Sequence, residues 1–90
     1  MEIKFSTKAQ EDIEYWKKIG NHAIMKKITL LLRDISVHPY VGTGKPERLK
    51  YDLSGCWSRR INAEHRIVYI VREAENEVYI LALRYHYDKS

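Results

Sequence analysis

The sequence predicts a single α+β domain, residues 1–90, with an N-terminal strand, two helices and a mostly antiparallel β-sheet. Its 90 residues suffice for one small domain. Apolar residues recur at helical spacing through the first half of the chain. In the second half, short runs rich in β-branched and aromatic residues alternate with turn residues, and no helix-length segment separates them. Hairpins should therefore join these strands, with the helices covering one face of the sheet.

The first half predicts one strand followed by two helices. Residues 2–5 favour a strand, and Ser6 or Thr7 can cap the first helix. Asn21 can cap the second helix, which Pro39 should end. Each helix has an apolar stripe that should face the core, with Ala9, Ile13 and Trp16 in the first and Met25, Ile28, Leu31, Leu32 and Ile35 in the second.

The second half predicts a loop and then four strands. The string GTGKPERLK (residues 42–50) begins as a loop, because glycine and proline interrupt regular structure. Ser54-Gly55 indicates a turn, and residues 73–77 indicate a polar hairpin loop. The strands are expected at residues 49–53, 57–61, 66–72 and 78–85. Strand alternation should place Arg66, Val68 and Ile70 on one face and Ile67, Tyr69 and Val71 on the other.

The charge distribution favours a phosphate-binding second half. The net charge is +4, from 16 basic and 12 acidic residues. Residues 1–45 contain seven lysines and one arginine, whereas residues 46–90 contain two lysines and six arginines. Arginine has the planar, forked set of donors that suits phosphate, while lysine on a helix surface more often serves solubility. A modest basic excess is compatible with a polyanionic partner without identifying one.

Several classes of protein do not fit the sequence. No apolar run approaches the roughly 20 residues of a membrane span, and the N-terminus lacks the pattern of a secretion signal. Cys56 is the single cysteine, and no histidine stands at metal-ligand spacing from a second ligand. Nucleotide-binding glycine motifs are also lacking. We therefore expect a cytoplasmic domain with no disulfide, metal or cofactor.

Polar residues of the second half suit metal-free cleavage of RNA, although they also suit a generic basic interaction domain. Glu47, His86 and several arginines could supply a base, an acid and positive charge at a phosphate. RNA brings its own nucleophile, the 2′-hydroxyl group. Trp16 and Trp57 are expected in the core rather than as platforms for bases, and His65 is expected as an ordinary surface or loop residue.

Four strings in a fixed order identify a resemblance that covers essentially the whole chain. GKPERLK, LSGCWSRRI, EHRIVYIV and the late RYHY together resemble the YoeB/Txe branch of the RelE-like toxins. The resemblance implies a microbial-ribonuclease-like fold and a bacterial toxin of a type II toxin–antitoxin system. Such a toxin enters the ribosomal A site and cuts mRNA, and a YefM/Phd-like antitoxin neutralises it. A homodimer is a further possibility that the resemblance leaves open.

The same resemblance implies a role for each site residue. Glu47 would be the general base, Arg66 would stabilise the charged phosphorane, His86 would be the general acid, and Tyr87 would orient the substrate. The residues expected to hold the RNA backbone are Lys50, Arg59 and Arg60. The chain departs from the family pattern in its last three residues, Asp88-Lys89-Ser90, which follow the final tyrosine.

Two other functions stay open at this point. The domain could be a non-catalytic toxin-like module that binds antitoxin and acts as a co-repressor on operator DNA. It could also be a general RNA-binding domain. Glu47 and His86 discriminate between these hypotheses and the nuclease, because phosphate binding alone favours neither a loop carboxylate nor a general acid.

Overall fold

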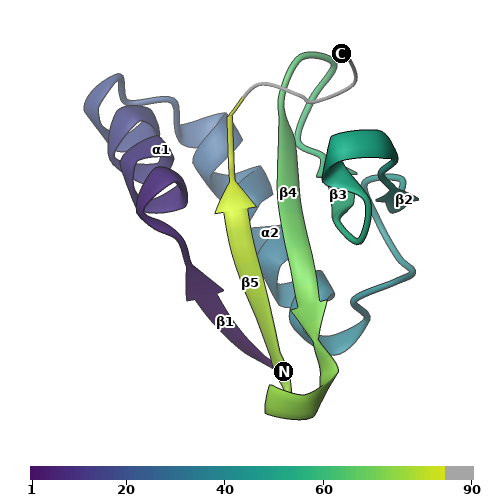
Figure 1. Ribbon diagram of the computed structural model, residues 1–90. Helices are drawn as coiled ribbons and strands as arrows, with labels where there is room; N and C mark the ends of the chain where they lie inside the picture. The colour runs from purple at the N-terminus through teal and green to yellow at the C-terminus, as the bar shows by residue number, and fades with distance from the viewer. Residues whose placement is uncertain (85–90) are drawn as a thin grey trace.

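The protein folds as a five-stranded sheet with two helices on one face (Figure 1). The computed structural model describes residues 1–84. The regular elements, in chain order, are β1 (Glu2–Phe5), α1 (Thr7–Lys18), α2 (His22–Val37), β2 (Glu47–Arg48), β3 (Trp57–Arg60), β4 (Arg66–Arg72) and β5 (Glu77–Ala82). Two one-turn 3₁₀ helices, Tyr51–Leu53 and Glu73–Glu75, lie in the connections.

The order of strands confirms the predicted α+β class. The sheet runs β1-β5-β4-β3-β2, so the last three long strands form a hairpin-connected meander. All neighbouring pairs are antiparallel except β1 and β5, which run parallel in the register Ile3 opposite Val78. The two helices connect β1 to the rest of the sheet; in Figure 1, α2 lies behind β5 and β4, and α1 lies to the left of β5, which it contacts.

Both helices begin where the sequence predicts a cap. The Ser6 hydroxyl accepts a hydrogen bond from the Ala9 amide at 3.0 Å, so Ser6 rather than Thr7 caps α1. The Asn21 side-chain oxygen accepts from the Ile24 amide at 3.1 Å and caps α2. Each bond satisfies one of the amides that the first helical turn leaves without a partner.

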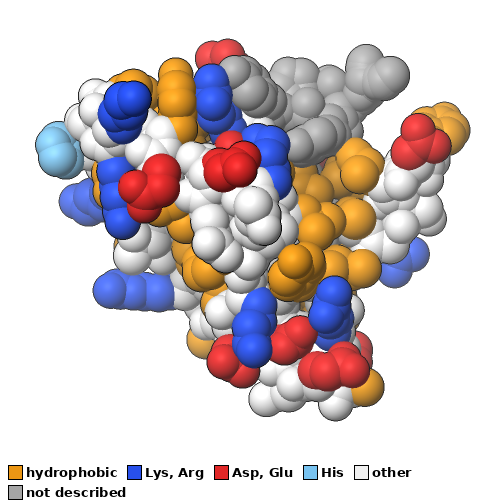
Figure 2. Space-filling model, turned by 60° about the vertical axis from the view of Figure 1, so that its left-hand side comes forward, with side chains coloured by type: hydrophobic (Ala, Val, Ile, Leu, Met, Phe, Trp, Pro, Cys, Tyr) orange, Lys and Arg blue, Asp and Glu red, His pale blue; other side chains and the backbone are white. Residues whose placement is uncertain are grey.

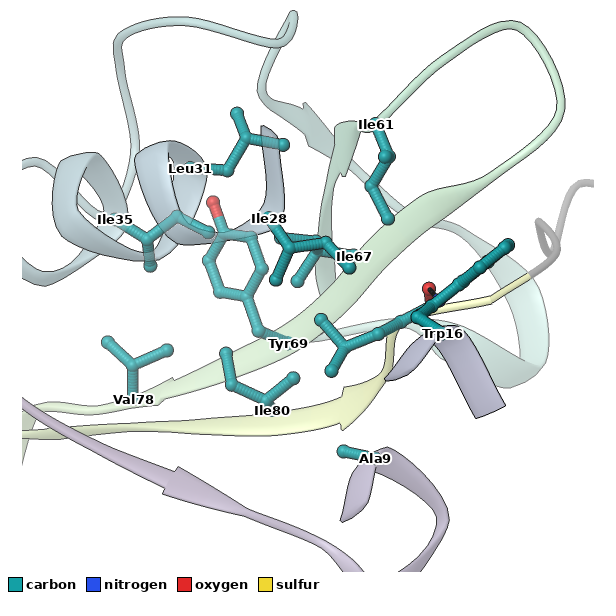
Figure 3. Packing of buried hydrophobic residues seen from close by; sticks show 11 residues of the cluster. Ala9, Trp16, Ile28, Leu31, Ile35, Ile61, Ile67, Tyr69, Val78 and Ile80 are labelled. Atoms are coloured by element: carbon teal, nitrogen blue, oxygen red, sulfur yellow. Dashed lines mark hydrogen bonds between the residues drawn. The ribbon is translucent and has the colours of Figure 1, made fainter. Parts of the chain in front are cut away.

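The main core lies between the helices and the sheet (Figure 3). In Figure 3, Ile28, Leu31 and Ile35 of α2 approach Tyr69 of β4, whose hydroxyl group points toward the helix. That hydroxyl donates to the Pro39 carbonyl at 2.7 Å, so the chain beyond α2 satisfies the one polar atom of the ring. Ile67 and Tyr69 lie in this core, which confirms the predicted alternation along β4.

The opposite side of the sheet is here called the open face. Val68, Ala82 and Cys56 form a small buried cluster there, against which Leu49 and Leu53 pack. Residues 49–53 were expected to form a strand, and that expectation is wrong. Tyr51 has φ of 59°, which is incompatible with an extended strand, and the following 3₁₀ turn folds both leucines over the cluster. The strand before it is only the two residues of β2.

Candidate active site on the open face of the sheet

The register of β2, β3 and β4 brings distant polar residues onto the open face. Glu47 lies opposite Ser58, and Arg60 lies opposite Arg66. Residues directly opposite one another in antiparallel strands point to the same face, as do residues two apart along one strand. Glu47, Ser58, Arg60 and Arg66 therefore share the open face, although they come from three strands.

Glu47 and Arg66 form an ion pair across these strands. The Arg66 Nη1 atom lies 3.0 Å from Glu47 Oε1 and 3.4 Å from the Ser58 hydroxyl oxygen. The Arg66 side chain is 19% exposed and that of Glu47 is 59% exposed. The guanidinium is therefore partly enclosed by the sheet, while the carboxylate stands at its edge and can reach a group that approaches from solvent.

A carboxylate beside a guanidinium can act on a phosphate ester of RNA. A carboxylate can accept a proton from a hydroxyl group within hydrogen-bonding reach. A guanidinium held in place beforehand can stabilise negative charge that develops on a phosphate oxygen. The sequence predicted both roles for these residues, and the structure brings the two side chains into contact.

The other basic residues expected to bind RNA fall into two groups. Lys50 and Arg60 are exposed, and Arg60 lies beside Arg66 in the register of β3 and β4. Arg59, in contrast, is completely buried, so the expectation that it holds RNA backbone is wrong. Since successive strand residues point to opposite faces, Arg59 projects into the layer between sheet and helices while Arg60 stays on the open face.

The surface charge offers no continuous basic field in the view of Figure 2. Figure 2 shows the side of the molecule that carries α1, where positive and negative side chains are intermixed. Attraction of a polyanion to this side would therefore be weak.

His86 and Tyr87 lie outside the described residues, but the chain just before them is firmly held. The Leu83 amide donates to Asp12 Oδ2 at 2.9 Å, and the Trp16 indole donates to the Leu83 carbonyl at 3.0 Å. Asp12 and Trp16 are both buried on α1. The Arg84 guanidinium lies 3.5 Å from the centre of the Tyr15 ring. Helix α1 therefore holds residues 83 and 84 through three of its side chains.

Asp12 was not identified from the sequence, although a signal was there. It lies three residues after Ala9 and four before Trp16, so it falls within the apolar stripe of α1. A carboxylate in such a stripe must find partners in the interior. The Leu83 amide and the Lys8 ammonium group supply them, the latter at 2.6 Å.

His65 lies in the connection between β3 and β4, as expected of a loop residue, but it is buried rather than at the surface. It is 7% exposed and packs edge-on against Trp16, with 4.8 Å between the ring centres. Trp16 is buried as expected, while Trp57 is half-buried between Tyr40 and the Arg48 guanidinium. Within residues 1–84, no three His, Cys, Asp or Glu side chains gather as metal ligands would. No helix in that part of the chain could cross a membrane.

Comparisons with known proteins agree with this architecture. Residues 5–87 match the family of YoeB-like toxins of bacterial type II toxin–antitoxin systems. The chain is 45% identical to the Escherichia coli K12 protein "Toxin YoeB" over 87 residues, which are 97% of this chain and 100% of the relative.

Solved structures show the same likeness. A YoeB/ParE toxin from Agrobacterium tumefaciens superposes with a TM-score of 0.90 at 38% identity, covering 97% of this chain and 100% of the other. Staphylococcus aureus YoeB, solved in a heterotetrameric complex with YefM, has a TM-score of 0.84 at 43% identity, covering 97% and 98%. The chain thus belongs to the YoeB-like toxins of bacterial type II toxin–antitoxin systems.

Proposed function

We propose that this toxin is an endoribonuclease that cuts mRNA in the ribosomal A site and so inhibits translation. The observation that carries the proposal is the ion pair of Glu47 with Arg66 on the open face, at 3.0 Å. Membership of the YoeB-like toxins supports it. The pair combines a proton acceptor with a fixed positive charge, which are the two groups that attack by a ribose hydroxyl most needs.

The proposed reaction needs no metal ion, because RNA supplies the nucleophile. Glu47 takes the proton of the 2′-hydroxyl group, whose oxygen then attacks the adjacent phosphorus atom. Arg66 stabilises the charge on the phosphorane oxygens. The bond from phosphorus to the 5′-oxygen breaks, and His86 gives that oxygen a proton. The products are a 2′,3′-cyclic phosphate and a 5′-hydroxyl end, with Tyr87 orienting the substrate.

Lys50 and Arg60 are proposed to hold the RNA backbone beside this pair. Both are exposed, and Arg60 lies opposite Arg66 in the register of β3 and β4. A domain of this size offers few further contacts, so the ribosome must orient the flexible mRNA. Such positioning can contribute several kcal/mol to lowering a barrier. Cleavage of naked RNA should consequently be slow.

We further propose that a YefM/Phd-like antitoxin neutralises the toxin, since S. aureus YoeB was solved with YefM. That same relative was also solved as a dimer, which supports a homodimer of this chain. A ribosome-dependent activity places the protein in the cytoplasm. An antitoxin segment that folds on the toxin would suit a system in which the inhibitor must be removed readily.

The experiment that tests the proposal compares translating ribosomes with naked mRNA. The wild-type chain should cut ribosome-bound mRNA at a codon in the A site and leave 5′-hydroxyl ends, which polynucleotide kinase labels without prior phosphatase treatment. Glu47→Ala should remove this cleavage. Glu14→Ala, at an exposed acid on α1, is the matched control and should cut like the wild type.

Equal rates on naked and ribosome-bound mRNA would contradict ribosome dependence. No cleavage by the wild-type chain, combined with antitoxin-dependent binding to the operator DNA of its own gene, would favour the non-catalytic co-repressor instead. Binding of RNA without cleavage on ribosomes would leave only the general RNA-binding domain.

A further inference from the structure

Arg59 has the most complete set of hydrogen bonds among the described residues. Its side chain is 0% exposed. The Nε atom donates to the Tyr69 hydroxyl at 3.1 Å, and Nη1 donates to Asp34 Oδ2 at 2.6 Å and to the Thr43 carbonyl at 2.9 Å. Nη2 donates to the carbonyls of Val41, at 2.9 Å, and His38. A guanidinium has five N–H groups, and all five are used.

Three of these acceptors belong to one segment, residues 38–44, which leads from the end of α2 toward β2. Further hydrogen bonds fix the same segment, including the one from the Tyr69 hydroxyl to the Pro39 carbonyl. The Thr43 amide donates to Asp34 Oδ2 at 3.1 Å, and the Arg60 amide donates to the Gly44 carbonyl at 2.7 Å. Asp34 thus binds both the guanidinium and the segment, and its charge offsets that of the buried arginine.

The segment packs so closely at Gly42 and Gly44 that neither position has room for a side chain. A Cβ atom at Gly42 would lie 2.1 Å from Asp34 Oδ2, and one at Gly44 would lie 2.8 Å from Leu31 and 3.3 Å from the Cβ of Arg59. Both glycines also have positive φ, 127° and 79°. The path of this segment therefore depends on its contacts with Asp34, Leu31 and Arg59.

Only Lys45 and Pro46 separate this segment from Glu47, and the strand that carries Glu47 is too short to fix its own position. β2 contains only Glu47 and Arg48 and lies at the edge of the sheet, paired with β3 alone. The neighbour of Arg59 in β3, Ser58, is the residue opposite Glu47. Arg59 thus fixes the chain on both sides of Glu47, through the segment before it and through the strand beside it.

We propose that Arg59 is a positioning residue for the proposed cleavage: from the helix-covered side it holds residues 38–44 and thereby places the Glu47 carboxylate against Arg66. The role rests on the proposed ribonuclease function. Arg59 touches neither Glu47 nor any group that reacts, so it acts through the segment. A displacement of about 1 Å in a catalytic group can cost about a hundredfold in rate.

Lysine cannot replace arginine in this role. An ammonium group keeps the positive charge for Asp34 but has three donors at one point, whereas the five acceptors surround a plane. Arg59→Lys therefore separates the charge of the residue from its geometry. Gly44→Ala perturbs the same segment by crowding Leu31 and the Cβ of Arg59, while the guanidinium group of Arg59 is kept.

The test measures cleavage, binding and loop mobility at a temperature at which every variant is folded by circular dichroism. Arg59→Lys and Gly44→Ala should each lower the single-turnover cleavage rate at saturating ribosome concentration by about tenfold to a hundredfold. Binding to 70S ribosomes should change less than about threefold. Hydrogen exchange of the Thr43 and Arg60 amides should become faster. Ile35→Val, a core change on α2, should alter neither the rate nor this exchange.

Three outcomes would overturn the role. One is wild-type cleavage by Arg59→Lys despite faster exchange in the segment. Another is an equal loss of cleavage in Ile35→Val, since that would show a general effect of stability. The third is unchanged exchange in both segment variants. If the wild-type chain itself cut no mRNA, the ribonuclease proposal would fail, and the exchange data would still report whether Arg59 holds the segment.

Discussion

The two faces of the sheet use the same kind of residue in opposite ways. On the helix-covered face, all five donors of Arg59 are bound by the protein, which leaves none for a ligand. On the open face, the Arg66 guanidinium bonds to described residues through Nη1 alone and is 19% exposed. An arginine side chain that points into the core can therefore organise the fold. One that points to the open face keeps donors that could bind a phosphate.

The largest effect on stability should come from the helix-covered face. Ile80 of β5 is fully buried in the main core, and Ile80→Ala should lower the free energy of unfolding by about 2–5 kcal/mol, from lost burial and the cavity left behind. Ile70→Ala, on the half-buried open face of β4, should cost less than half as much. Urea denaturation measures both, and equal losses would contradict the contrast between the faces.

The largest effect on activity should come from Arg66 of the open face and from His86, the proposed general acid. Arg66→Ala and His86→Ala should each reduce single-turnover cleavage on the ribosome by about tenfold to a hundredfold, the low end for one positioned group. The free energy of unfolding of Arg66→Ala should change by less than about 1 kcal/mol, because an ion pair whose carboxylate is open to solvent contributes little. Loss of ribosome binding in parallel with cleavage would show that Arg66 serves attachment rather than the chemical step.

Much of the fold could be predicted from the sequence because local signals and global packing agree. The caps at Ser6 and Asn21, the two apolar stripes and the alternation along β4 all appear in the structure as expected. The strand predicted for residues 49–53 is absent from the structure, although the composition of these residues suits a strand. Tyr51 instead has a left-handed conformation, and Leu49 and Leu53 on either side of it pack on the open face, a tertiary contact that no local pattern contains.

The site was predicted from the resemblance more than from chemistry, and that explains its one clear error. The motif contains two neighbouring arginines, and both were expected to bind RNA. Alternation along a strand already implied that Arg59 and Arg60 point to opposite faces. The sequence could not reveal that Asp34, 25 residues earlier, binds the Arg59 guanidinium on the helix-covered side of the sheet.

Stability at low pH should depend on that partner. The bonds from Arg59, and less so from the Thr43 amide, hold the pKa of the Asp34 carboxyl below its usual value of 3.8. A lowered folded-state pKa means that the contribution to stability is complete above about pH 4 and is lost as the pH falls through the lowered value. The loss should be moderate, because Asp34 is 24% exposed and water replaces part of the lost interaction.

Asp34→Asn isolates this contribution. The variant should be less stable than the wild type at pH 7, because the buried Arg59 charge lacks its counterion. Its free energy of unfolding should then fall less between pH 5 and pH 2.5 than that of the wild type. Chemical denaturation at a series of pH values measures both curves, and parallel curves would show that Asp34 does not titrate in this range.

The smallest effect should come from Arg60, the exposed neighbour of the buried arginine. Loss of one phosphate contact to single-stranded RNA should change the slope of log K against log salt concentration by about 0.7. Arg60→Gln should show this change in binding to a 2′-O-methyl RNA oligonucleotide, which cannot be cleaved, while the free energy of unfolding stays within about 0.5 kcal/mol. Arg33→Gln, at an exposed arginine on α2, is the matched control and should keep the wild-type slope. An unchanged slope in Arg60→Gln would show that the backbone of the RNA does not follow the open face past β3, and the contact with phosphate would then rest on Arg66 and Lys50.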